Sequence, residues 1–154
     1  MPGKIAVGID GSAASQAAVQ WASAEARIRS ARVVAIHVWS YMPITAIGDP
    51  GMVPIAGGDL PGQLEAERTA AEVQLDTALA AAFPDGIPGE LERRLVEGDA
   101  GDALVAEAGD ADLIVVGSRG HGGLTSAIVG SVSRHVIHHA GCPVVVVKAP
   151  TESG

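Results

Sequence analysis

Five short apolar runs alternate with segments of helical periodicity along these 154 residues, and this alternation restricts the fold more than any other feature. The runs cover residues 4–9, 32–39, 91–96, 113–116 and 143–148, and most are rich in β-branched residues, as buried strands are. Strands joined through helices run parallel, with helices covering both faces of the sheet. The sequence therefore predicts an α/β domain built on a single open, mostly parallel five-stranded sheet of the Rossmann-like kind.

The segments between the runs supply the expected helices and one irregular stretch. Ser12 and Asp99 are placed to cap two helix N-termini, and the run at 91–96 alternates apolar with charged residues, which predicts a strand near an edge. Repeated Pro and Gly between residues 40 and 62 predict irregular structure there. The residues expected to face the core are Ala17, Trp21, Ala24 and Ile28 in the first helix, Leu64, Ala71, Leu75, Leu79 and Ala82 in the second, Leu104, Val105 and Ala108 in the third, and Val132, Val136 and Ile137 in the last.

Charge and composition exclude several classes of partner. The formal net charge is -8, and Arg93 with Arg94 is the one pair of adjacent basic residues, which argues against a nucleic-acid partner. The N-terminus lacks the apolar core of a signal peptide, no apolar run is long enough to span a membrane, and the single Cys142 forms no internal disulfide. We therefore expect a cytoplasmic protein with one domain over residues 1–148 and a disordered tail over 149–154.

A glycine-rich stretch follows the fourth run and leads into the last helix. Gly117 and Gly120 open it, and Gly130 with Ser131 stands where the helix begins. Glycine lets a backbone approach an anion closely, and free N–H groups at a helix N-terminus bind phosphate. Ligands of such sheets lie beyond the carboxyl ends of the strands, where the strand order reverses. If the first and fourth strands are neighbours, Asp10 and the glycine stretch face one crevice.

These motifs, taken together, resemble the nucleotide-binding branch of the universal stress protein family. The likeness rests on the Gly-2x-Gly-9x-Gly-Ser spacing from Gly117 to Ser131 and on VGIDGS, HVW, DLIVVGSRG and CPVVVVK, so it extends over nearly the whole chain. It implies an adenine nucleotide alpha hydrolase-like fold and a stress or regulatory protein that binds an adenine nucleotide. ATP is the first candidate and cyclic AMP the second.

The same resemblance implies roles for individual residues. Asp10 would lie beside the ribose, the adenine or a nucleotide-bound metal, and Val38 would lie against adenine. As the one acidic group near the phosphates, Asp10 leaves magnesium binding open. The strand end and the loop would supply Val116, Gly117, Arg119 and Gly120, with Arg119 either paired to a phosphate or exposed to solvent. The phosphate oxygens would be held by Gly130, Ser131, Val132 and Ser133.

Nothing in the sequence predicts a fast enzyme. There is no GxxxxGK[ST] lysine and no His/Glu pair placed to activate water, so we expect a sensor or carrier with no catalytic residue, and slow ATP hydrolysis stays open. His135, His138 and His139 have a spacing that can bind a metal, but no acidic residue or cysteine accompanies them nearby. Cys142 is expected to be a packed residue rather than a nucleophile.

Two functions of other classes compete with nucleotide binding. A phosphoacceptor receiver domain shares the strand and helix order and would use Lys148, but Asp10 stands without the second acidic residue that a receiver needs. A dimeric interaction module without a bound nucleotide is the other alternative. The family resemblance implies a homodimer through the last strand, Val144 to Val147, and an exposed apolar edge strand does need covering.

Overall fold

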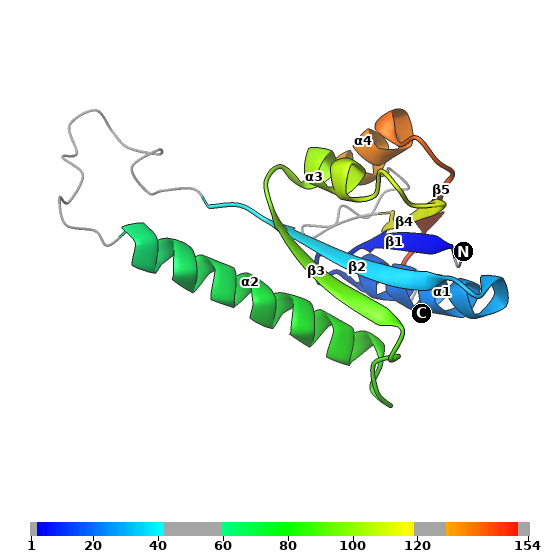
Figure 1. Ribbon diagram of the computed structural model, residues 1–154, viewed down its shortest axis with the longest axis horizontal. Helices are drawn as coiled ribbons and strands as arrows, with labels where there is room; N and C mark the ends of the chain where they lie inside the picture. The colour runs from blue at the N-terminus through cyan, green and yellow to red at the C-terminus, as the bar shows by residue number, and fades with distance from the viewer. Residues whose placement is uncertain (1–2, 42–59, 119–128, 151–154) are drawn as a thin grey trace.

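A computed structural model gives the fold (Figure 1) and describes residues 3–41, 60–118 and 129–150. The five strands form one sheet in the order β3-β2-β1-β4-β5, and every neighbouring pair is parallel. The predicted fold class and the edge position of the third strand are therefore confirmed. The elements in chain order are β1 (Lys4–Gly8), α1 (Ala13–Arg29), β2 (Arg32–Trp39), α2 (Leu60–Ala82), β3 (Leu91–Glu97), α3 (Ala100–Glu107), β4 (Leu113–Gly117), α4 (Ser131–His139) and β5 (Val144–Val147).

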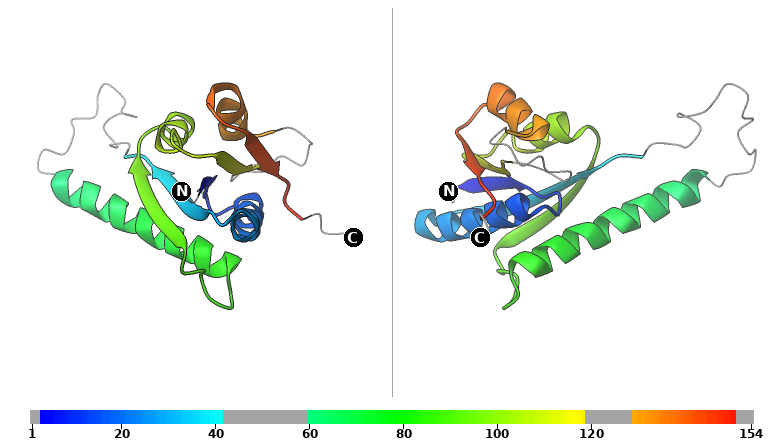
Figure 2. Two further views of the ribbon diagram at one scale, coloured as in Figure 1. Left: turned by 45° about the vertical axis from the view of Figure 1, so that its right-hand side comes forward. Right: turned by 180° about the vertical axis from the view of Figure 1, so that it is seen from behind.

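Helices cover both faces of the sheet, two on each side. Figure 2 shows α1 and α2 on one face and α3 and α4 on the other. Because successive strand residues point to opposite faces, Ile5 and Val7 of β1 join the core under α1 and α2. Ala6 between them joins the core under α3 and α4. Alternation along each strand thus produces two separate cores, one per face.

The predicted core face of α1 is wrong. Its buried residues are Ala14, Ser15, Ala18, Val19, Ala22, Ser23 and Ala26. Ile28, which we expected to be buried, is 79% exposed, and Trp21 is partly buried at the margin of the core. Small side chains let the helix backbone lie close to the sheet, so the alanine stripe faces inward and the larger residues lie at its border.

Helix α2 begins earlier than the sequence predicted. The segment 60–62 was expected to be irregular but forms the first turn of α2, where Pro61 is tolerated because N–H groups in a first turn have no acceptor in the helix. Of its predicted core residues, Ala71, Leu75, Leu79 and Ala82 are buried, whereas Leu64 is only half-buried. The rest of the predicted irregular stretch, 42–59, lies outside the described residues. Within the described ranges, no helix is both long enough and apolar enough to cross a membrane.

In the last helix, α4, the predicted apolar face is correct at one position of three. Val136 is fully buried, whereas Val132 and Ile137 are exposed. Ser133 is the other buried residue of this helix. The short α4 therefore touches the sheet along a narrow line and leaves its flanks to solvent.

A buried lysine joins the amino ends of β1 and β4. Lys4 Nζ donates to the Glu107 carbonyl at 3.3 Å and to the carboxylate of Asp110, and the Lys4 N–H donates to Asp112 Oδ2 at 2.8 Å. The hydrogen bond from Lys4 holds the pKa of the Asp110 carboxyl below its usual value. These contacts fix the register of β1 and β4 at their amino ends. The carboxyl ends of the same two strands form the candidate site.

Candidate functional site

The strand order reverses between β1 and β4. Strand β1 pairs with β2 on one side and with β4 on the other, so the chain leaves β1 and β4 from neighbouring carboxyl ends (Figure 1). The condition set by the sequence, that the first and fourth strands are neighbours, is therefore met. The N-termini of α1 and α4 lie at this same edge, one on each face of the sheet. Such a switch point is where open α/β sheets bind ligands.

The turn after β1 is held by short side chains. Asp10 Oδ1 accepts from the Ser12 N–H at 2.9 Å, and the Asp10 N–H donates to Ser15 Oγ at 3.3 Å. Gly11 has a φ of 84°, a left-handed conformation that favours glycine. The Asp10 carboxylate is exposed, and its Oδ2 has no hydrogen-bond partner within the described part of the chain. Asp10 is thus a turn residue whose carboxylate remains exposed at the carboxyl end of β1.

Gly117 ends β4 against the first turn of α1. A Cβ on Gly117 would lie 2.7 Å from the carbonyl carbon of Ala14 and 2.9 Å from the Ser15 nitrogen, closer than side-chain atoms normally come. This glycine is therefore required for helix packing, whatever its part in binding. Just beyond it, Ser118 accepts a hydrogen bond from the Gly130 N–H at 2.7 Å, which brings the start of α4 to the end of β4.

The N-terminus of α4 has no side-chain cap. Gly130 is the N-cap, with φ -63° and ψ 164°, and makes no capping side-chain bond. The first N–H groups of a helix have no acceptor inside it, and the helix dipole adds positive potential there. Ser131 is exposed, whereas Ser133 is buried and its hydroxyl donates to the Gly117 carbonyl at 2.5 Å. Ser133 can therefore offer a ligand its backbone N–H but not its hydroxyl.

Val38 stands at the end of β2, on the other side of β1. Its side chain is partly buried against the core under α3 and α4, and that of Val116 is fully inside the same core. The pairing of β1 with β2 ends at Gly8 and Ile36. The next rung would join the Val38 N–H to the Ile9 carbonyl, but that carbonyl is bonded to His37 Nδ1 at 2.8 Å instead. The Val38 N–H therefore lacks the ladder hydrogen bond to Ile9.

The sequence predicted no role for His37, the residue before Val38. In the HVW motif, the family resemblance implies a role for Val38 alone. The available signal was a single histidine in an otherwise apolar strand. Its contact with Ile9 depends on the order of the strands, which the sequence did not specify.

The structure brings most of the predicted residues to one edge of the sheet. Asp10, Val38, Gly117 and the residues 130–133 all lie at the carboxyl ends of β1, β2 and β4. Arg119 and Gly120 lie outside the described residues. Their placement in the site stays a prediction.

The histidines of α4 make protein contacts of their own. His135 Nε2 lies 2.8 Å from Asp102 Oδ1 on α3, and its ring stacks on that of His139 with centroids 4.2 Å apart. Within the described ranges, no three His, Cys, Asp or Glu side chains are grouped to hold a metal ion. Cys142 packs at the border of the core under α3 and α4, and burial raises the pKa of its thiol, which disfavours the reactive thiolate.

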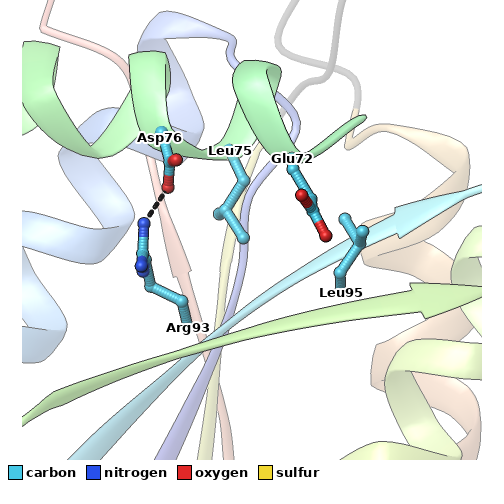
Figure 3. A pocket seen from close by; sticks show the side chains of 5 residues that line it. All are labelled: Glu72, Leu75, Asp76, Arg93 and Leu95. Carbon is cyan, nitrogen blue, oxygen red and sulfur yellow. Dashed lines mark hydrogen bonds and ion pairs between the residues drawn. The ribbon is translucent and has the colours of Figure 1, made fainter. Parts of the chain in front are cut away.

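A shallow groove lies between α2 and β3 (Figure 3). It is lined by Glu72, Leu75, Asp76, Arg93 and Leu95, and Arg93 forms an ion pair with Asp76 across it. This groove is at the β3 edge of the sheet, with β2 and β1 between it and β4. Among the described residues that line the groove, Arg93 is the cation, and it is already paired with Asp76. We therefore assign the groove no role.

Comparison with known sequences points to one family. The sequence profile described as the universal stress protein family matches residues 1–148. Universal stress protein Rv2005c of Mycobacterium tuberculosis is 36% identical over 147 residues, which cover 94% of this chain and 45% of the relative. A universal stress protein of Mycolicibacterium smegmatis is also 36% identical, with the same two coverages. The chain thus spans about half the length of these curated relatives.

Solved structures agree with the sequence comparison. UspA from Lactobacillus plantarum has a TM-score of 0.71 at 26% identity, covering 94% of this chain and 97% of its own. A universal stress protein in complex with cAMP has a TM-score of 0.64 at 26% identity, over 97% and 98%. The protein from Archaeoglobus fulgidus in complex with dAMP has a TM-score of 0.59 at 27% identity, over 96% and 98%.

Proposed function

This chain belongs to the universal stress protein family, and from that membership we propose that it binds an adenine nucleotide at the carboxyl ends of β1 and β4. Relatives of the same fold are described in complex with cAMP and dAMP, both of which are adenine nucleotides. The observation that carries the proposal to this chain is the convergence of three unlike groups at one edge. Within the described residues, these are the Asp10 carboxylate, the backbone edge of Val38, which lacks its ladder bond to Ile9, and the N-terminus of α4, which has no side-chain cap.

Each of these groups suits one part of an adenine nucleotide. Adenine presents an acceptor at N1 beside the N6 amine, which complements the N–H and carbonyl of Val38. Asp10 Oδ2 can accept from a ribose hydroxyl. The N–H groups of Ser131, Val132 and Ser133 begin α4, where phosphate is favoured. We therefore place adenine by β2, ribose over the turn after β1, and phosphate at α4.

We keep ATP as the first ligand and cyclic AMP as the second. The named complexes of relatives contain monophosphates, and a net charge of -8 opposes a highly charged anion at long range. Arg119, inside the loop motif, is the side chain that would favour a triphosphate. Asp10 is the single acidic group proposed for the site, so a magnesium ion would depend on it and on the phosphates. Holding a nucleotide as a sensor or carrier fits this set of groups better than rapid hydrolysis.

We further propose that two copies pair through β5. Within the described part of the chain, this strand has a neighbour on one side only, and all four of its valines are partly exposed. An uncovered apolar edge strand is a site for pairing with another chain. Since the chain spans 45% of its relative Rv2005c, a second copy would supply a comparable length of protein.

Substitution at the start of α4 tests the nucleotide proposal. We expect Gly130→Leu to weaken binding of ATP and of cyclic AMP at least tenfold, because the new side chain blocks the approach of phosphate to the helix N-terminus. The φ of -63° at Gly130 is accessible to leucine, so the fold should persist. Isothermal titration calorimetry measures the affinity, and thermal unfolding reports stability separately.

Gly141→Leu is the matched control. Gly141 lies just beyond the C-cap of the same helix, and a Cβ there would meet nothing within 4 Å. The control should bind as the wild type does. No detectable binding to the wild type at millimolar nucleotide, or an equal loss in both variants, would count against the proposed site.

A further inference from the structure

His37 is a polar side chain buried in an apolar strand. It is 8% exposed and lies on the same side of β2 as Val33 and Ala35, which belong to the core under α1 and α2. Its Nδ1 lies 2.8 Å from the Ile9 carbonyl. A carbonyl can only accept, so Nδ1 carries a proton, and in the neutral ring Nε2 then carries the lone pair. Nε2 is buried and has no hydrogen-bond partner within the described ranges.

A leucine or valine at this position would fill core space without burying an unpaired acceptor. A buried polar atom without a partner destabilises a fold, so packing alone does not account for histidine here. The bond that the ring does make is specific. It ends on the last backbone carbonyl before Asp10, at the point where the chain leaves the sheet.

The hydrogen bond from His37 to the Ile9 carbonyl takes the place of a backbone hydrogen bond between β1 and β2. The Ile9 N–H donates to the Ile36 carbonyl at 2.8 Å, so β1 is still in line with β2 at this residue. In a continuing parallel ladder, the Ile9 carbonyl would accept from the Val38 N–H. The pairing of β1 with β2 stops at Gly8 and Ile36, and the Ile9 carbonyl accepts from His37 Nδ1 instead. On the other side of β2, the Trp39 carbonyl accepts from the Gly98 N–H, so β3 stays paired.

We infer that His37 is a positioning residue for the nucleotide site. By holding the Ile9 carbonyl, its Nδ1–H keeps the Val38 N–H out of the ladder and available to the adenine N1 acceptor. The inference rests on the proposed function. It adds a residue that touches no part of the nucleotide and acts through Ile9 and Val38.

Hydrogen exchange of backbone amides tests the inference without a ligand. In the wild type, the Val38 amide should exchange at least tenfold faster than the Ile36 amide, which remains in the ladder. In His37→Leu, the Ile9 carbonyl becomes free to accept from Val38, and exchange at Val38 should slow at least tenfold. His37→Asn keeps an amide donor attached at the same carbon as Nδ1, so Val38 should exchange as in the wild type. Equal exchange at Val38 and Ile36 in the wild type, or no change at Val38 in His37→Leu, would overturn the inference.

Base preference is the second readout. The inosine base carries a proton at N1 and cannot accept from the Val38 N–H, so the wild type should bind ATP at least tenfold tighter than ITP. We expect His37→Leu to reduce that ratio to within about threefold of unity. His37→Asn should retain it. General destabilisation would weaken both nucleotides together and leave the ratio unchanged.

The two hypotheses fail in different ways. A wild type that binds no adenine nucleotide overturns the proposed function and the role of His37 with it. A wild type that prefers ATP, with the same preference in His37→Leu, overturns the role of His37 alone. Thermal unfolding of each variant verifies that the titrated protein is folded.

Discussion

Replacing Leu79 with alanine is expected to lower the free energy of unfolding by about 2–5 kcal/mol. Leu79 is 0% exposed, lies on the inner face of α2 and belongs to the core under α1 and α2. Removing the isopropyl end of its side chain leaves a cavity that close-packed neighbours fill only in part. Urea unfolding followed by circular dichroism measures the change.

Val73→Ala in the same helix is the control. Val73 is 58% exposed, so its truncation should change the free energy of unfolding by no more than about 0.5 kcal/mol. Equal effects of the two substitutions would show that α2 does not cover the sheet with this face.

Gly117→Ala is expected to lower the free energy of unfolding by about 1–3 kcal/mol, although it adds a single methyl group. The new Cβ would lie 2.7 Å from a backbone carbon of Ala14, and a helix backbone cannot rotate away as a side chain can. The first turn of α1 must shift, and the turn that contains Asp10 is bonded to it through Ser15. Nucleotide affinity should therefore fall together with stability, as paired unfolding and calorimetry measurements would show.

Gly89→Ala is the control for that substitution. A Cβ at Gly89 meets nothing within 4 Å, so the variant should be as stable as the wild type. If Gly117→Ala were equally stable, the close contact between β4 and α1 would be wrong. Because a substitution at Gly117 is expected to lower stability as well as affinity, Gly130 is the better position for testing nucleotide binding alone.

Much of the fold could be predicted because strand signals are local. The second strand was predicted at its exact bounds, 32–39, since its β-branched run ends abruptly at both sides. The inner face of α1 could not be predicted from periodicity, because apolar residues recur at helical spacing on two faces, one made mostly of small residues and one that includes Trp21 and Ile28. On the second face Ile28 is exposed and Trp21 is only partly buried, because small side chains let the first face pack closer to the sheet. Pro61 was expected in irregular structure. A proline disrupts a helix in its interior but is tolerated in its first turn, where Pro61 lies.

The site could be predicted in outline but not in its connections. Asp10 and Gly117 follow recognisable strands, and a parallel sheet brings such positions to one edge. The bond from the Ser133 hydroxyl to Gly117 and the bond from His37 to Ile9 join residues that are 16 and 28 positions apart. Such contacts depend on strand order and helix placement, for which the sequence carries no local signal.

Amide chemical shifts recorded during a nucleotide titration test the central claim most directly. With ATP or cyclic AMP, we predict saturable shifts at Asp10, Val38 and Ser118 and at residues 130–133. The amides of Leu75 and Arg93, in the groove between α2 and β3, should stay unchanged. No shift at millimolar nucleotide, or shifts confined to that groove, would contradict an adenine-nucleotide site at the carboxyl ends of β1 and β4.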